Sequence, residues 1–210
     1  MPAPDRVVDW NELSFKFMLQ RLGVTLGDPF VANGQDWTMK IEIEDDDGNV
    51  VESVGYAEIV LVNWIGAQVA GIGGYDILDE RSGDLEKIAG VLFDDREIVA
   101  DMEDMVAVPE GRLLVLDRVW IDPKFRGQEL GPKSAIVALS TLQGVGGFAA
   151  CFPSPFEGDP EPKDRAAAIA RLGAIWSRVG FRHFRDGVWV LDLANNDLPN
   201  AAKDLGIELA

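Results

Sequence analysis

The sequence has almost none of the residues that build disulfides and most metal sites. Its 210 residues include one cysteine, Cys151, and one histidine, His183. A single cysteine excludes an internal disulfide framework and a cysteine-built structural zinc site. A single histidine argues equally against a multi-histidine metal site. We therefore expect no metal centre, and we interpret Cys151 as inert filler of a buried strand and His183 as a sheet residue.

Basic residues are scarce as well. The chain has 19 lysines and arginines against 36 aspartates and glutamates, a formal net charge of -17. This balance argues against nonspecific nucleic-acid binding, which depends on neutralising phosphates with basic side chains. An acidic protein would instead attract cations, including amine-bearing substrates, although the same charge serves solubility or salt adaptation equally well.

Long hydrophobic runs are also missing. No apolar run reaches the roughly 18–20 residues that a membrane helix needs, and the start "MPAPDRVVDW" lacks the basic-then-apolar pattern of a signal peptide. We therefore expect a soluble cytoplasmic protein that makes no membrane contact. The length and the 47% hydrophobic content suit one domain with a substantial core.

The apolar pattern predicts strands and helices from Trp37 onward, whereas residues 1–36 are hard to interpret. There, "ELSFKFMLQRLG" fits either an edge strand or a short helix. Beyond it, the pattern indicates a strand in "WTMKIEIE" with a turn at "DDDGN", one or two strands in 50–78, and two short helical pieces in 84–106.

The second half of the chain is clearer. It predicts, in order, a strand "RLLVLDRVWID", a helix "GPKSAIVALSTLQG", a strand "GGFAACFP", a helix over about 163–179, and a hairpin "FRHFRDGVWVLDL" that turns at Asp186-Gly187. Strands in this order with interleaved helices predict a mixed α/β (α+β) fold, with a mostly antiparallel central sheet flanked by helices.

The stretch "DPKFRGQELG" (Asp122 to Gly131) joins the strand that starts at Arg112 to the helix that follows. A turn that opens a helix presents unpaired amides and the positive end of the helix dipole, so it can hold an anion. Lys124, Arg126 and Lys133 add three cations to this region of an acidic chain. Glu129 opposes them, and a positive φ there would strain its backbone. The alternative is a turn that serves folding alone.

Residues 126–131 and their flanks resemble a known family. "RGQELG" is similar to the [Arg/Gln]-x-x-Gly-x-[Gly/Ala] loop of the GNAT superfamily of acyl-CoA-dependent N-acetyltransferases, with Glu129 in place of the first motif glycine. The element order over roughly residues 110–193 and "IWSRVGF" (Ile175 to Phe181) also resemble the family. The resemblance implies a single acetyltransferase-like domain over 1–210, with a coenzyme-binding core at 110–193 and a C-terminal tail at 194–210.

The resemblance also implies a reaction and a site. Acetyl-CoA would donate its acetyl group to an amine-bearing acceptor, either a small molecule or a protein. The main chain of Val119, Trp120 and Ile121 would pair with the pantetheine arm and polarise the thioester carbonyl. The coenzyme pyrophosphate would lie against Arg126, Gly127, Gln128, Glu129, Leu130, Gly131 and Lys133.

Catalysis would need a proton acceptor and an acid for the leaving thiolate. Asp117 is the candidate base, because burial in an apolar strand would raise its pKa. The alternatives are an ion pair with an arginine or exposure at a bulge. Trp176 stands where many relatives have a tyrosine acid, and its helical spacing is typical of a core residue. Tyr56 or Tyr75 could replace that acid.

Two other functions fit the same residues. Trp176 and Glu129 are compatible with a non-catalytic acyl-CoA-binding or regulatory protein. The acidic composition is compatible with an interaction protein that binds a basic partner and whose loop is purely structural. Three tryptophans that look exposed in the sequence, Trp10, Trp37 and Trp64, permit a homodimer.

Overall fold

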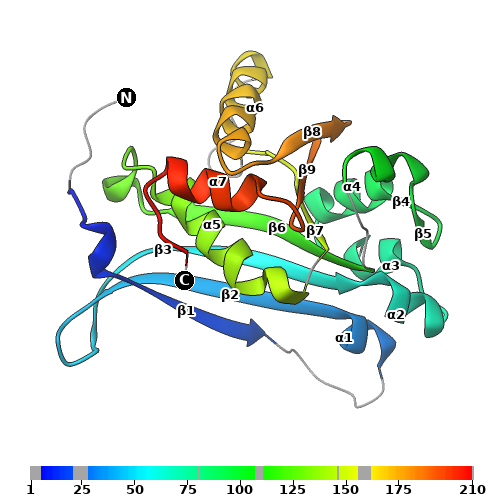
Figure 1. Ribbon diagram of the computed structural model, residues 1–210, viewed down its shortest axis with the longest axis horizontal. Coiled ribbons are helices and arrows are strands. Elements are labelled where there is room, and N and C mark those ends of the chain that lie inside the picture. Colours follow the sequence, from blue (N-terminus) through cyan, green and yellow to red (C-terminus); the bar gives the residue numbers. More distant parts are fainter. Residues whose placement is uncertain are drawn as a thin grey trace.

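The protein is built on one seven-stranded sheet with helices packed around it (Figure 1). The computed structural model describes residues 6–20, 28–79, 81–106, 111–145, 147–155 and 162–209. The strand order is β1-β2-β3-β6-β7-β9-β8, and every neighbouring pair is antiparallel except β6 and β7. The mixed, mostly antiparallel α/β fold predicted from the sequence is confirmed.

The first three strands form an antiparallel unit at one edge of the sheet. They are β1 (Leu13–Gln20), β2 (Gly34–Glu44) and β3 (Val50–Asn63), with the short helix α1 (Pro29–Asn33) before β2. The ambiguous N-terminal segment is therefore the edge strand β1, paired along its whole length with β2. The predicted turn follows β2, where Asp45 accepts a hydrogen bond from the Asn49 amide at 2.8 Å.

Between β3 and β6 the chain is mainly helical. After β3 come α2 (Trp64–Val69) and α3 (Gly74–Asp79). Of the one or two strands expected in 50–78, the chain forms one, because the Asn63 side chain accepts the Gly66 amide at 3.0 Å and begins a helix within an apolar run. Local capping here overrides the β-branched composition.

The next segment was predicted to hold two helical pieces, and it holds one. The first is α4 (Gly83–Leu92), capped by Ser82. The second is replaced by the two-residue strands β4 (Phe93–Asp94) and β5 (Glu97–Ile98) and a 3-10 helix. Asp95 adopts φ 56° in the turn between these strands, which breaks the helical course that the residue spacing predicted.

Strand β6 (Arg112–Ile121) lies at the centre of the sheet, and its two edges differ. It pairs with β3 from one end to the other. It pairs in parallel with β7 (Phe148–Cys151) only from Leu113 to Val115. Within the described residues, the second half of β6 has no strand on its β7 side, so its main-chain groups there face an open edge.

Helices α5 (Leu130–Leu142) and α7 (Asp197–Asp204) pack against one face of the sheet, and α6 (Pro162–Ser177) projects beyond it (Figure 1). The predicted hairpin is β8 (Arg182–Arg185) and β9 (Val188–Asp192). Helix α7 belongs to the segment expected as a tail, yet Leu198, Ala201 and Ala202 are buried in the core.

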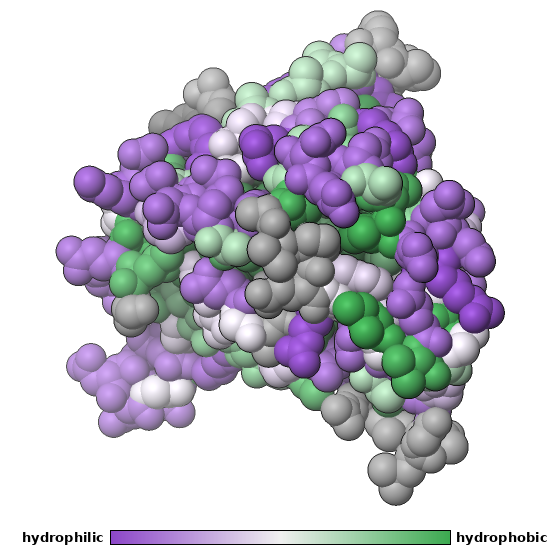
Figure 2. Space-filling view, turned by 45° about the vertical axis from the view of Figure 1, so that its right-hand side comes forward, coloured by the Kyte–Doolittle hydropathy of each residue, from purple (hydrophilic) through white to green (hydrophobic). Residues whose placement is uncertain are grey.

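The three tryptophans expected at the surface are not exposed. Trp64 is only 4% exposed and meets the rings of Phe93 and Phe148 edge-on. Trp10 and Trp37 are partly buried against the core. The expected exposure of Trp64 is therefore wrong, and the homodimer stays a prediction. One face of the molecule carries mostly hydrophilic residues with smaller hydrophobic patches (Figure 2). No helix within the described ranges is both long enough and apolar enough to cross a bilayer.

Candidate functional site

The loop over residues 126–131 is held in shape from both sides. Before it, the Asp122 side chain accepts the Lys124 amide at 3.0 Å, and the Phe125 ring is fully buried. Within it, the Gln128 side-chain amide donates to the carbonyls of Phe125 at 3.0 Å and Arg6 at 2.7 Å. The Gln128 side-chain oxygen accepts the Val8 amide at 2.9 Å. Gln128 therefore braces the loop rather than reaching toward a ligand.

Glu129 has the left-handed backbone that a glycine would adopt without strain, with φ 62° and ψ 15°. It is the residue before α5, but its side chain does not cap the helix. Its carboxylate instead lies 2.6 Å from a guanidinium nitrogen of Arg178, which follows α6. The expected conflict with positive φ is real, whereas the carboxylate does not fill the helix N-terminus.

The main-chain amides of residues 127–131, which we call the loop amides, are the central feature of the site. Among the described residues, none of them donates to a protein acceptor. The Lys133 amide is the first to bond back, to the Glu129 carbonyl at 3.1 Å, and Pro132 has no amide hydrogen. The loop amides and the dipole of the 13-residue helix α5 are together suited to hold an anion.

Gly131 has no packing reason to be glycine. A β-carbon placed on it would meet no atom within 4 Å, and its φ is not in the positive range. Glycine within a helix is less favourable than alanine by about 1 kcal/mol. The missing side chain leaves space above the loop amides that the fold itself does not fill.

The predicted cations take different positions around this loop. Lys124 pairs with Glu52 and is largely neutralised. Lys133 lies with its ammonium 5.4 Å from the centroid of the Trp10 ring, at the first turn of α5. Arg126 donates its Nε–H to the Ile121 carbonyl at 2.8 Å.

Arg178 is a fourth cation at the loop. Sequence reasoning did not identify it, because only the tertiary fold brings the end of α6 here.

The open edge of β6 leads directly into the loop. The Asp122 amide donates to the Val54 carbonyl at 2.9 Å, on the β3 side. Main-chain groups alternate between the two edges of a strand, so Val119 and Ile121 direct theirs to the open edge. Their side chains pack toward the core, while Trp120 lies on the other face of the strand.

Asp117 occupies a β-bulge in β6. The register passes from the pair Glu58 and Arg118 to the pair Ile59 and Leu116, which leaves Asp117 as the extra residue. It is partly buried, and burial raises the pKa of its carboxyl group, while the neighbouring Arg118 guanidinium lowers it. The bulge that we considered as an alternative is present, together with the raised pKa that a base needs.

The structure separates the aromatic residues that were weighed as general acids. Trp176 is partly buried against the core and meets the Phe181 ring edge-on at 6.3 Å, as its spacing predicted. Tyr56 lies on β3 directly opposite Trp120, with the two rings stacked at 5.7 Å. Tyr75 lies on α3, where a hydrogen bond with Asp79 raises its pKa. Tyr56 is therefore the tyrosine beside β6.

Cys151 and His183 have structural positions. Cys151 is buried at the end of β7, and burial raises the pKa of its thiol well above the usual value. A thiol of this kind is a poor nucleophile at neutral pH. His183 is exposed on β8, with its ring edge-on to Trp189 at 5.6 Å. Both positions agree with the sequence interpretation.

The loop amides, the open edge of β6 and the carboxylate of Asp117 follow one another along a single strand and the turn after it. The first can bind an anion, the second can hydrogen-bond an extended chain, and the third can accept a proton. Comparisons of this chain with protein-family models, with curated proteins and with solved structures find no match.

Proposed function

We propose that the protein binds acetyl-CoA and transfers the acetyl group to an amine-bearing acceptor. The observation that carries this proposal is the set of loop amides at the start of α5, which donate to no acceptor in the part of the protein that the structure describes. A diphosphate is the ligand for which amides, a helix dipole and the neighbouring Arg126 and Lys133 are suited. The open space above Gly131 lets such a group approach the main chain.

The open edge of β6 supports the choice of coenzyme. A pantetheine arm is an extended chain with two amides, and it needs a partner with alternating N–H and C=O groups. The main chain of Val119 and the Ile121 amide offer these groups, whereas the Ile121 carbonyl already accepts the Arg126 Nε–H. Trp120 completes the stretch implied by the resemblance to the GNAT superfamily. The ligand would continue the sheet where β7 has ended.

The chemistry asks little of side chains. Acetyl-CoA supplies an acyl group activated as a thioester. The acceptor amine arrives as ammonium with a pKa of about 10. Asp117 therefore takes a proton from the ammonium group before the nitrogen attacks. A main-chain amide of the open β6 edge stabilises the carbonyl oxygen while the C–N bond forms and the C–S bond breaks. CoA leaves as the thiolate, and the nitrogen loses its second proton to solvent. The acidic surface attracts a cationic acceptor.

One observation favours a second function, that of a coenzyme-binding protein without turnover. Trp176 is committed to the core and has no readily lost proton to give to the thiolate. Tyr56, the tyrosine beside β6, would have to supply that proton from a different strand. This second protein would bind the same coenzyme through the same loop.

Two measurements test and separate these functions. Calorimetric titration with acetyl-CoA is expected to give saturable heat with a stoichiometry of one per chain. Release of free thiol is then followed across a panel of amines that includes diamines, polyamines and lysine-rich peptides. Absence of binding contradicts both functions. Binding without thiol release above hydrolysis, for every acceptor, leaves only the non-catalytic one.

The variant Arg126→Glu is expected to weaken acetyl-CoA binding by about tenfold or more, because it places a carboxylate beside the diphosphate. Arg112→Glu is the matched control, since it reverses the same charge at the exposed start of β6. The titration of both variants measures the effect. Equal affinity in the two would show that the diphosphate lies away from Arg126.

A further inference from the structure

The ion pair between Glu129 and Arg178 contributes little to the stability of the fold, although the Glu129 backbone is strained. Glu129 has φ 62°, in a region that residues with a β-carbon seldom adopt. Among the described residues, its side chain forms an ion pair with Arg178, at 2.6 Å. The two side chains are 46% and 50% exposed, and ion pairs so open to solvent contribute little to stability.

The other strained positions have ordinary explanations. Asp95 and Asp186 also have positive φ without being glycine. Both lie in the short turns of hairpins, where aspartate is well tolerated. Glu129 is a longer residue at a helix start, and it does not cap that helix. Strain that the fold does not explain tends to mark function.

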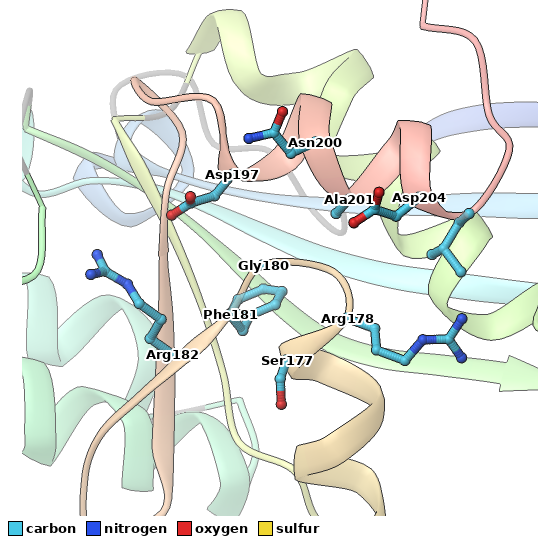
Figure 3. A pocket seen from close by; sticks show the side chains of 10 residues that line it. Ser177, Arg178, Gly180, Phe181, Arg182, Asp197, Asn200, Ala201 and Asp204 are labelled. Atoms are coloured by element: carbon cyan, nitrogen blue, oxygen red, sulfur yellow. The ribbon is translucent and has the colours of Figure 1, made fainter.

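Arg178 contacts the loop through Glu129 and also lines a neighbouring hollow. The hollow has a volume of about 430 Å³ and lies between the end of α6, β8 and α7 (Figure 3). Its charged lining residues are Arg178, Arg182, Asp197 and Asp204. Arg182 donates to the Met105 carbonyl at 2.6 Å, and Asp197 bonds with Asn195.

The guanidinium of Arg178 extends away from that of Arg182, on the side of Asp204 and the end of α7 (Figure 3). Its ion pair with the Glu129 carboxylate ties it to one residue of the loop as well. Arg178 therefore lines the hollow and contacts the loop through an exposed carboxylate.

We propose that Arg178 binds a phosphate group of the coenzyme, and that Glu129 holds the guanidinium in position until that phosphate replaces the carboxylate. The inference rests on the proposed function and extends it to residues outside the loop motif. A phosphate accepts two parallel hydrogen bonds from guanidinium and carries more charge than a carboxylate, so it displaces Glu129. Glu129 is half-exposed and can turn to solvent once it is released.

The test is a double-mutant cycle with CoA, measured by calorimetry on Glu129→Gln, Arg178→Ala and the double variant. Arg178→Ala is expected to weaken CoA binding by about tenfold. Glu129→Gln is expected to strengthen it by about threefold, since the guanidinium no longer has to leave a carboxylate. In the Glu129→Gln background, loss of Arg178 should weaken binding by more than tenfold, because the whole phosphate contact is then lost.

Arg171→Ala is the matched control, because Arg171 is an exposed arginine on α6, seven residues before Arg178. If Arg178→Ala and Arg171→Ala bind CoA equally, or if Glu129→Gln weakens binding, the inference is wrong and the proposed function stands. If neither the natural protein nor Glu129→Gln binds CoA, the inference and the proposed function are both wrong.

Two further readouts define the contact. Dephospho-CoA lacks the 3′-phosphate, so an Arg178→Ala effect that disappears with this ligand assigns the residue to that group, and one that persists assigns it to the diphosphate. Glu129→Gly should raise the melting temperature relative to Glu129→Gln, because only glycine relieves the backbone strain. Equal melting temperatures would contradict the strain on which the inference depends.

Discussion

Replacing Gly131 with aspartate is expected to make the protein more stable and to reduce its affinity for acetyl-CoA by about a hundredfold or more. Gly131 is the second residue of α5, and a β-carbon there meets nothing within 4 Å. A carboxylate in the first turn of a helix is favourable, and replacing glycine adds to the helix propensity. The same carboxylate would occupy the position proposed for the diphosphate and repel it.

The expected gain in stability is about 1 kcal/mol, which corresponds to a rise in melting temperature of about 2–4 °C for a chain of this size. Calorimetric titration gives the affinity, and thermal unfolding gives the stability. Gly131→Ala is the control, since it adds the β-carbon without the charge and should weaken binding much less. If Gly131→Asp binds acetyl-CoA as the natural protein does, the loop amides are not the diphosphate site.

Much of the second half of the fold is predictable from sequence because its signals are local and agree with one another. The run from Arg112 to Ile121 is a strand, Pro132 stands in the first turn of α5, and Asp186-Gly187 turns the last hairpin. Each of these positions combines periodicity with a residue that favours one backbone conformation. Agreement between levels makes such elements recoverable from one sequence.

The segment between β3 and β6 shows where local signals compete. Residues after Asn63 are apolar enough to continue a strand, but the Asn63 side chain caps a helix, and Trp64 is then buried. From residue 94 to 97, helical spacing gives way to a turn at Asp95 and a two-strand hairpin. Tertiary packing decides both cases, and the sequence pattern does not contain that information.

The site divides in a similar way. The amides at the start of α5 follow from a strand, a turn and a helix in sequence, so they can be predicted. The partners of its charged side chains cannot, because they come from distant segments. Lys124 pairs with Glu52, and Arg178 arrives from α6 to meet Glu129. The positive φ of Glu129 follows from the glycine position in the resemblance, but the direction of its carboxylate does not.

Asp117 combines a position in a β-bulge with a carboxyl group whose pKa is raised. In a regular strand, a residue between Leu116 and Arg118 would fall into the alternation of the sheet faces. The bulge leaves Asp117 without a cross-strand partner on β3, next to the pair Glu58 and Arg118. Partial burial then raises the pKa of the carboxyl group, and the adjacent guanidinium limits the increase.

Asp117→Asn is expected to lower the rate of acetyl transfer by about a hundredfold to a thousandfold and to leave acetyl-CoA affinity unchanged. In the natural protein, the rate should fall as the pH drops through the raised pKa of Asp117, because only the ionised carboxylate accepts the proton. That limb of the pH profile should be lost in the variant. The exposed turn variant Asp186→Asn removes the same charge far from β6 and should behave as the natural protein does.

Asp117→Asn is expected to raise the stability of the fold although it lowers the rate of acetyl transfer. Because the pKa of Asp117 is higher in the folded chain than in the unfolded chain, the folded state loses stability as the pH rises from the unfolded value through the folded one. Asparagine resembles the protonated side chain, so Asp117→Asn should be more stable than the natural protein at neutral pH. The difference should vanish below the unfolded pKa. Thermal unfolding across that pH range measures the difference in stability.

A variant that is stabilised yet transfers acetyl groups at the natural rate would show that Asp117 is not the base. Its carboxylate would then be only a partly buried group of the bulge.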